Sequence, residues 1–233
     1  MELNSLSRVS CVFHLGDSLK VAAFDVDAQK CFTDLCPDEL PVPGGTEIVA
    51  ELNRQAELAS VRLGSKDAHP SHGAWEIDPA APQQASLADY PNVDRHWPRH
   101  GVRHTRGCEL LPGLPPVSGY DYFVWKGIEP DMHPYGACYH DLAGRMSTGA
   151  IEFLTLRGIE TVLVAGLALD YCVKVTALQL ARAGFRVVLN RAGCRGVQLH
   201  SSAAAIEEMT AAGIVVVDCS AVLSVDQAQV GLR

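Results

Sequence analysis

The chain alternates short apolar runs with stretches in which apolar residues recur at helical spacing. Six apolar runs predict strands, over residues 20–26, 59–65, 121–126, 160–166, 185–189 and 213–217. Four stretches between them predict helices, over residues 44–57, 142–156, 172–183 and 200–212. Strands that alternate with helices are typical of βαβ units, so we expect an α/β fold with a mainly parallel six-stranded sheet.

Helix ends and loops mark the rest of the chain. Gly158, Gly184 and Gly213 fall where the predicted helices should end. Residues 66–118 are rich in Pro, His and Gly and predict a long irregular insert, and such loops are uncommon unless they build a site. No linker divides residues 20–233, which we interpret as one domain. Residues 1–19 form an N-terminal extension, either a strand or a loose arm.

Composition narrows the partners that the chain can have. Of its 233 residues, 48% are hydrophobic and 20% are charged, which is ordinary for a globular protein. The net charge of -8 disfavours attraction to nucleic acid or to anionic lipid. No segment approaches the roughly 20 apolar residues of a membrane span. We therefore expect a small-molecule partner, no nucleic acid and no membrane, and the sequence leaves open a homo-oligomer.

The number and spacing of the cysteines indicate the redox environment in which the protein works. Eight cysteines are scattered without a tight repeating spacing, in a chain too large to need disulfides for stability. The N-terminal residues lack the pattern of a secretory signal. Free thiols in a reducing, cytoplasmic environment fit this sequence best.

Three reactive side chains follow predicted strands. Asp27 ends the first strand, Lys126 the third, and Cys172 lies where the fourth strand gives way to a helix. Carboxyl ends of parallel strands meet in one crevice, so an acid, a base and a thiol should share a site. A helix N-terminus would lower the pKa of Cys172 and favour its thiolate. Taken singly, each residue could equally be a packing or capping residue.

The insert carries a second candidate group. Asp67 and His69 are two residues apart, so in extended backbone their side chains point to one side, and His100 comes from the segment Trp97-Pro98-Arg99-His100. One carboxylate and two imidazoles suit one divalent metal ion, with Zn favoured and Fe or Mn as alternatives. Whether His72 is a further ligand stays open. His96 and His104 fit structural or solvent-facing roles, and we assign no catalytic role to His133 or His140.

Four motifs together resemble the nicotinamidases of the isochorismatase-like cysteine hydrolase superfamily. They are residues 27–32 (DAQKCF), the pair Lys126-Gly127 with Tyr135 downstream, residues 166–173 (GLALDYCV), and the Asp-x-His with Trp-Pro-x-His combination. The resemblance runs from about residue 20 to about residue 218. It implies a Rossmann-like three-layer sandwich and a metal-assisted hydrolysis of nicotinamide to nicotinate and ammonia, a step of NAD salvage.

The resemblance also implies roles for single residues. Asp27 is the general base and acid, Lys126 supports it, and Cys172 is the nucleophile that forms a thioester. The backbone amides of Ala168 and Cys172 form the oxyanion hole, with a cis peptide between Leu167 and Ala168. The predicted substrate-binding residues are Phe32, Trp97, Tyr135 and Leu167, and the metal orients the pyridine ring.

Two features depart from the family pattern, and other functions stay in view. Cys31 stands where an acidic residue is usual, and residues 101–104 replace a cysteine-containing stretch, which leaves the use of pyrazinamide open. A non-metal amidase of the superfamily would lack Asp67, His69 and His100. An isochorismatase would not use the cysteine. A noncatalytic metal-binding protein on the same fold would bind the metal without hydrolysing an amide.

Overall fold

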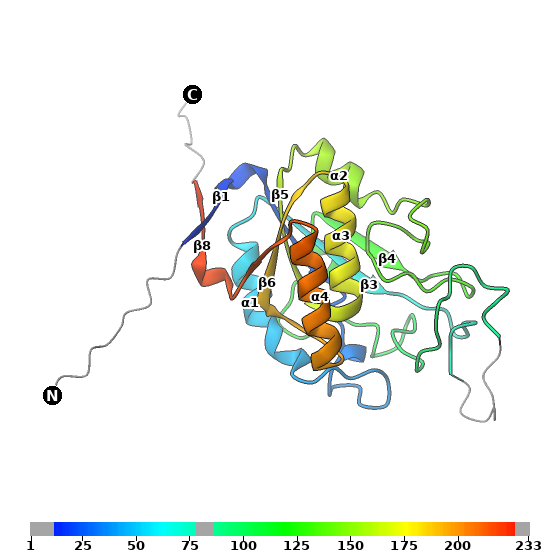
Figure 1. The fold of residues 1–233 in the computed structure, drawn as a ribbon. Coiled ribbons are helices and arrows are strands. Elements are labelled where there is room, and N and C mark those ends of the chain that lie inside the picture. Colours follow the sequence, from blue (N-terminus) through cyan, green and yellow to red (C-terminus); the bar gives the residue numbers. More distant parts are fainter. Residues whose placement is uncertain (1–11, 78–85, 227–233) are drawn as a thin grey trace.

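Six parallel strands form the central sheet of the computed structural model, which describes residues 12–77 and 86–226 (Figure 1). The sheet order is β4-β3-β2-β5-β6-β7. The strands are β2 (Val21–Val26), β3 (Val61–Asp67), β4 (Tyr122–Lys126), β5 (Thr161–Leu167), β6 (Arg186–Arg195) and β7 (Val215–Val217). Each predicted strand is present, which confirms the mainly parallel six-stranded sheet.

Within the described residues, four α-helices lie in the connections between these strands. They are α1 (Val49–Ala56), α2 (Ala150–Leu156), α3 (Lys174–Arg182) and α4 (Leu199–Ala211). The helix predicted over 142–156 begins only at Ala150, because Gly144 and Gly149 have positive φ values of 68° and 85° that interrupt a right-handed helix. The first predicted helix opens with a 3₁₀ turn, Gly45–Ile48, and α3 is preceded by a π-helical turn, Leu169–Val173.

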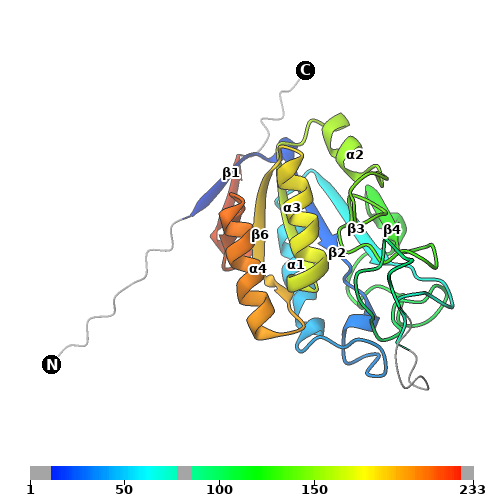
Figure 2. The ribbon, with the colours of Figure 1, turned by 45° about the vertical axis from the view of Figure 1, so that its right-hand side comes forward.

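The strand order reverses between β2 and β5. From β2 the chain moves outward through β3 to β4, and from β5 it moves the other way through β6 to β7. Right-handed crossovers therefore place α1 on one face of the sheet and α2, α3 and α4 on the other. Figures 1 and 2 show α3 and α4 side by side on that second face. In such sheets ligands bind at the carboxyl ends of the strands where the order reverses.

The two central strands are buried along their whole length and lie close together. Every residue of β2 and of β5 is buried, as expected for parallel strands covered on both faces. Gly166 pairs with Val26 and has a φ of 138°. A Cβ on Gly166 would lie 1.9 Å from the Val26 carbonyl oxygen, so only glycine permits this approach. The approach brings the segment after β5 close to the end of β2.

A second, two-stranded parallel sheet lies beside the main one. It consists of β1 (Phe13–Asp17) and β8 (Leu223–Asp226). Leu15 of β1 and Leu223 of β8 pack with Val21, Leu163 and Val188 of the main sheet in a small core. Within the predicted N-terminal extension, residues 13–17 are thus a strand. Residues 1–11 of that extension lie outside the described residues.

The predicted insert is irregular where it is described. Between Asp67 and the 3₁₀ turn Val117–Gly119, its described residues contain no helix and no strand, only isolated bridges such as His69 with Val102 and Glu76 with Trp97. Residues 78–85 lie outside the described part. Among the helices of residues 12–77 and 86–226, none has the length and apolar character needed to cross a membrane.

Candidate active site

Four strand ends bring four reactive side chains together. Asp27 follows β2, Asp67 ends β3, Lys126 ends β4, and Cys172 follows β5. The Lys126 Nζ lies 2.9 Å from Asp27 Oδ2, 2.5 Å from Asp67 Oδ1 and 3.6 Å from Cys172 Sγ. All four side chains are buried. The structure thus brings the three predicted catalytic side chains together, and it adds Asp67 as a second carboxylate beside the lysine.

The position of Asp27 is fixed by its backbone and by one hydroxyl. Its φ of 45° lies in the left-handed region, which a non-glycine residue seldom adopts. The Ser65 hydroxyl donates a hydrogen bond of 2.7 Å to Asp27 Oδ1. This leaves Oδ2 directed at the Lys126 ammonium. The carboxylate also lies close to the thiol, since one of its oxygens and the Cys172 Sγ are within 4.8 Å of each other.

The charges of this cluster shift one another's pKa values. Burial raises the pKa of Asp27 to about 6, against the opposing effect of Lys126. Burial would lower the pKa of Lys126, but Asp27 and Asp67 together outweigh it and hold that pKa well above its usual value. Burial would likewise raise the pKa of Asp67, and Lys126 and His69 outweigh it, so this pKa is well below its usual value. At neutral pH the cluster holds one cation and two anions.

Cys172 is a thiol at rest in this environment. Burial raises its pKa well above the usual value, Lys126 opposes this, and Asp27 and Asp67 add to it. This direction differs from the sequence-based prediction of a lowered pKa. The physical reason is that the sulfur is buried, and that the nearby carboxylates of Asp27 and Asp67 add to this effect. A base must therefore remove the thiol proton before the sulfur can react.

The segment before Cys172 has the unusual backbone that the resemblance implied. The peptide between Leu167 and Ala168 is cis, which confirms that expectation. The Ala168 carbonyl accepts hydrogen bonds from the amides of Tyr171 and Val173, at 3.1 and 3.2 Å. The carbonyl is thus directed into the π-helical turn that carries Cys172.

Beside this cluster lie the predicted metal ligands. His69 Nδ1 is 2.9 Å from the Gly127 carbonyl oxygen, and His100 Nδ1 is 2.6 Å from that of Pro98. A carbonyl accepts only, so both Nδ1 atoms carry the proton and both Nε2 atoms have a free lone pair. Those Nε2 atoms lie 3.6 and 3.8 Å from the Asp67 carboxylate. Asp67, His69 and His100 therefore present the donor set of a metal site, with second ring nitrogens anchored as metal-bound histidines require.

A third imidazole lies in this group, and the sequence did not indicate it. Three ring nitrogens lie within 4.8 Å of one another, one from each of His69, His100 and His133. All three residues are buried. Burial, followed by the neighbouring His69 and His100, lowers the pKa of His133 well below its usual value. His72 is exposed and outside this group. The signal for His133 in the sequence was its position two residues before Tyr135, in the segment that follows Lys126-Gly127.

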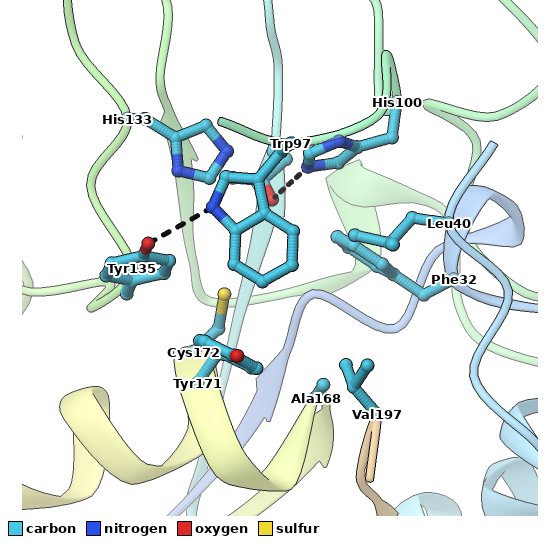
Figure 3. A pocket seen from close by; sticks show the side chains of 11 residues that line it. Phe32, Leu40, Trp97, His100, His133, Tyr135, Ala168, Tyr171, Cys172 and Val197 are labelled. Atoms are coloured by element: carbon cyan, nitrogen blue, oxygen red, sulfur yellow. Dashed lines mark hydrogen bonds and ion pairs between the residues drawn. The ribbon is translucent and has the colours of Figure 1, made fainter. Parts of the chain in front are cut away.

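A pocket opens between the two groups. Its wall combines the predicted residues Phe32, Trp97, Tyr135, Ala168 and Cys172 with His100, His133, Asp67, Leu40, Tyr171 and Val197. Figure 3 shows the Cys172 sulfur directed toward the space below the Trp97 ring, with His133 and His100 above it. The space that these side chains enclose is small, so it suits a small molecule rather than a polymer.

Hydrogen bonds hold the aromatic wall of the pocket. The Trp97 Nε1 donates to the Tyr135 hydroxyl at 3.1 Å, and that hydroxyl donates to Asp94 at 2.6 Å. Arg95 donates to the Tyr171 hydroxyl at 2.5 Å and lies over the Trp97 ring. Sequence reasoning missed this support, because residues 94 and 95 match no motif and approach Tyr135 and Tyr171 only in the fold.

One predicted substrate-binding residue lies elsewhere. Leu167 is fully buried in the main core and is not among the residues that line the pocket. As a residue of β5 its side chain packs near Gly45, 3.5 Å from the position that a Cβ would occupy. The prediction of substrate contact by Leu167 is therefore not supported by the pocket. Its peptide bond to Ala168 remains part of the site.

Fold and site together place the chain among α/β enzymes that carry an acid, an ammonium and a thiol where the strand order reverses. The sequence profile of the Isochorismatase domain matches residues 26–221. The chain therefore belongs to the isochorismatase-domain family, which confirms the resemblance stated from its motifs.

Named proteins that are similar to this chain are nicotinamidases and pyrazinamidases. A nicotinamidase of Escherichia coli (strain K12) is 35% identical over 185 residues, which cover 75% of this chain and 84% of that protein. A nicotinamidase and pyrazinamidase structure from Acinetobacter baumanii has a TM-score of 0.75 at 26% identity, over 85% of this chain and 96% of the other. A pyrazinamidase of Pyrococcus horikoshii, solved in complex with zinc, has a TM-score of 0.66 at 28% identity, over 85% and 98%.

Proposed function

We propose that this protein is an amide hydrolase that converts nicotinamide to nicotinate and ammonia through a thioester on Cys172. The observation that carries the proposal is the position of Lys126 Nζ, 2.9 Å from Asp27 Oδ2 and 3.6 Å from Cys172 Sγ. This arrangement puts a base and a cation beside a thiol that must lose its proton to react. The nicotinamidase relative at 35% identity supports the choice of substrate.

The first half of the reaction forms the thioester. Asp27 takes the proton from Cys172, and the Lys126 ammonium stabilises the thiolate. The sulfur then attacks the carboxamide carbon, and the C=O electron pair moves onto oxygen. We infer that the backbone amides of Ala168 and Cys172 donate to this oxyanion. Asp27 returns the proton to nitrogen, the C–N bond breaks, and ammonia leaves.

The second half releases the acid. Asp27, now a carboxylate again, takes a proton from a water molecule that attacks the thioester carbon. The C–S bond breaks, the proton held by Asp27 returns to the Cys172 sulfur, and nicotinic acid leaves and gives its remaining proton to the solvent as nicotinate. A pKa of about 6 for Asp27 suits this double role, because the carboxyl exchanges protons readily near neutral pH.

We further propose that Asp67, His69 and His100 hold one divalent metal ion beside the pocket, with Zn favoured over Fe or Mn. Two buried imidazoles with free Nε2 lone pairs 3.6 and 3.8 Å from one carboxylate fit such an ion. The metal, when bound, supplies a Lewis-acid position for a ring nitrogen and so orients a pyridine carboxamide. The zinc complex of the Pyrococcus horikoshii pyrazinamidase supports this assignment.

The aromatic wall would bind the ring itself. Phe32 and Trp97 offer apolar faces on which a flat heteroaromatic ring can pack, and Tyr135 holds Trp97 in place. Pyrazinamide has the same size and keeps a ring nitrogen at the equivalent position, so we propose that it is also a substrate. The pyrazinamidase activity in the names of two structural neighbours supports this.

The cellular setting follows from the same proposal. Hydrolysis of nicotinamide belongs to NAD salvage, which fits a small-molecule partner in the cytoplasm. The acidic net charge of -8 supports the absence of a nucleic-acid or anionic-lipid partner. A homo-oligomer stays a proposal to be tested by light scattering of the purified protein.

Nicotinate release from nicotinamide, followed by chromatography, tests the proposed function. The metal-replete wild type should turn over, and Cys172→Ala should lose activity by about 10⁴-fold or more, as for other nucleophile deletions. Hydroxylamine added during turnover should trap the thioester as the hydroxamate in the wild type but not in Cys172→Ala. No nicotinate from the metal-replete wild type would refute the choice of substrate.

Cys138→Ala is the matched control for this experiment. Cys138 is buried in the same core as Cys172 but lies outside the pocket, so its truncation costs packing without touching the reacting atoms. We expect this variant to keep the wild-type hydroxamate yield per active protein. Substantial turnover by Cys172→Ala would exclude the thioester route, whatever the behaviour of the control.

A further inference from the structure

The buried ring of His133 occupies a place that packing alone does not explain. It is stacked on the His69 ring, with centroids 5.0 Å apart and an interplanar angle of 16°. It meets the His100 ring edge-on at 5.5 Å. Figure 3 shows the His133 and His100 rings at the same end of the pocket, on either side of Trp97. His133 thus lies with the two predicted imidazole ligands, not at the surface.

Within the part of the chain that the structure describes, neither ring nitrogen of His133 has a hydrogen-bond partner. The same is true of His69 Nε2. His133 is only 3% exposed, so its ring has little contact with bulk solvent. A neutral imidazole has one donor and one acceptor, and leaving both unpaired in a protein interior is unfavourable. The cost disappears at the acceptor nitrogen if that atom binds a cation.

The backbone holds His133 in this position. Its amide donates a hydrogen bond of 2.8 Å to the Asn92 carbonyl, and Met132 forms an isolated bridge with Asn92. The segment after β4 is thereby attached to the insert that carries His100. His72, which the sequence left open as a ligand, is exposed and outside the group. The extra imidazole therefore comes from a different segment of the chain.

We propose that His133 is the third imidazole ligand of the divalent metal site formed with Asp67, His69 and His100. This inference rests on the metal assignment within the proposed function. A set of three imidazoles and one carboxylate selects borderline metals such as Zn²⁺ over Mg²⁺ or Ca²⁺. Because His133 also lines the pocket, it links the metal directly to the wall that contacts the substrate ring.

The affinity for Zn²⁺ alone, without substrate, tests this proposal. Competition with a chromophoric chelator should give a Kd that is about 10-fold or more higher for His133→Ala than for the wild type, since even outer contacts of metal ligands are worth 10–100-fold. The Co²⁺-loaded variant should also show a changed visible absorption spectrum. Free imidazole, entering through the pocket, should restore the wild-type spectrum, which a merely structural histidine would not allow.

Two histidine variants serve as controls. His72→Ala tests the ligand that sequence spacing suggests, and His200→Ala removes an exposed imidazole on α4 that does not line the pocket. Both should bind Zn²⁺ as the wild type does. If His133→Ala fails to fold by circular dichroism, His133→Asn replaces it in every measurement.

The outcomes separate this inference from the proposed function. Wild-type Zn²⁺ affinity in His133→Ala, with or without a raised KM for nicotinamide, would overturn the inference and leave His133 as a wall of the pocket. Weaker Zn²⁺ binding in His72→Ala but not in His133→Ala would also overturn it. Weakened binding in His133→Ala alone would support it, even if the wild type failed to hydrolyse nicotinamide.

Discussion

Two buried groups of side chains share the carboxylate of Asp67. The strand-end cluster consists of Asp27, Asp67, Lys126 and Cys172, and the imidazole cluster consists of His69, His100 and His133 beside Asp67. The two groups differ in whether their polar atoms have partners. In the strand-end cluster, Lys126 lies within 2.9 Å of both Asp27 and Asp67, so opposite charges meet inside the chain. In the imidazole cluster, His69 Nε2 and both nitrogens of His133 have no hydrogen-bond partner among the described residues. In the first group each carboxylate lies beside an opposite charge, whereas the second group leaves ring nitrogens that an ion could bind.

This difference indicates a division of labour. Charges that are already paired hold the thiol, its base and its cation in fixed positions, which is what a chemical step requires. Unpaired ring nitrogens are costly when nothing is bound, and their lone pairs become favourable ligands when a cation binds, which is what a binding site requires. Asp67 belongs to both groups, so a change of charge in one group should alter the electrostatic interactions in the other.

The largest effect is expected when the strand-end cluster loses its cation. Lys126→Met leaves the buried Asp27 carboxylate without an opposite charge and leaves Asp67 with only its imidazole neighbours, which should lower the free energy of unfolding by about 3–5 kcal/mol. It should also lower kcat on the order of 10³-fold, because Asp27 then binds its proton too tightly to act as a base. Denaturant titration and steady-state kinetics measure the two effects.

Lys66→Met is the matched control for that variant. Lys66 is also buried, but its ammonium donates to the Cys108 carbonyl and lies over the Trp125 ring rather than between carboxylates. We expect a loss of stability of about 1 kcal/mol, the usual value for a cation over an aromatic ring. Equal losses in the two lysine variants would contradict the idea that Lys126 stabilises the site by pairing two carboxylates.

Metal removal should show that the imidazole cluster acts in substrate orientation and the strand-end cluster in the chemical step. Stripping the protein with a chelator should lower kcat/KM for nicotinamide by about 10²-fold, the cost of misplacing a substrate ring, and added Zn²⁺ should restore it. Benzamide, which has no ring nitrogen, should be hydrolysed slowly and equally with and without the metal. Equal dependence of both amides on the metal would mean that the ion acts on the chemical step itself.

The pH dependence of the rate probes Asp27. Its pKa is raised to about 6, and it acts as a base only when ionised, so kcat/KM should rise with pH through about 6 and level off above it. Below that value the rate should fall about tenfold per pH unit. The Zn²⁺ content, measured at each pH, distinguishes a fall in kcat/KM caused by protonation of Asp27 from one caused by loss of the metal. A flat profile down to pH 5 at constant Zn²⁺ content would remove Asp27 as the base.

The smallest effect is expected at the pocket wall. Tyr135→Phe removes the hydroxyl that joins Trp97 to Asp94, worth about 1 kcal/mol, and should raise KM for nicotinamide about fivefold with little change in kcat. Tyr139→Phe, at a tyrosine outside the pocket, is the control. A large fall in kcat for Tyr135→Phe would instead place that hydroxyl in the chemical step.

Much of this molecule follows from local pattern. The six strands are predicted by their apolar runs, because strands of a covered parallel sheet are buried on both faces and contain few polar residues. Asp27, Lys126 and Cys172 are predicted to meet, because each directly follows a strand and the strand ends share one edge of the sheet. The helix predicted over 142–156 is too long, since apolar spacing alone does not weigh Gly144 and Gly149.

The sequence by itself therefore determined the fold class, three of the side chains that meet at the strand ends and two of the three imidazoles that lie together, since those residues lie in short motifs attached to regular elements. Only the tertiary structure brought His133 to His69, joined Asp94 to Tyr135 and raised the pKa of Cys172. Each of these depends on contacts between segments that are distant in the chain, and on a degree of burial that the whole fold creates. Local periodicity carries no information on either.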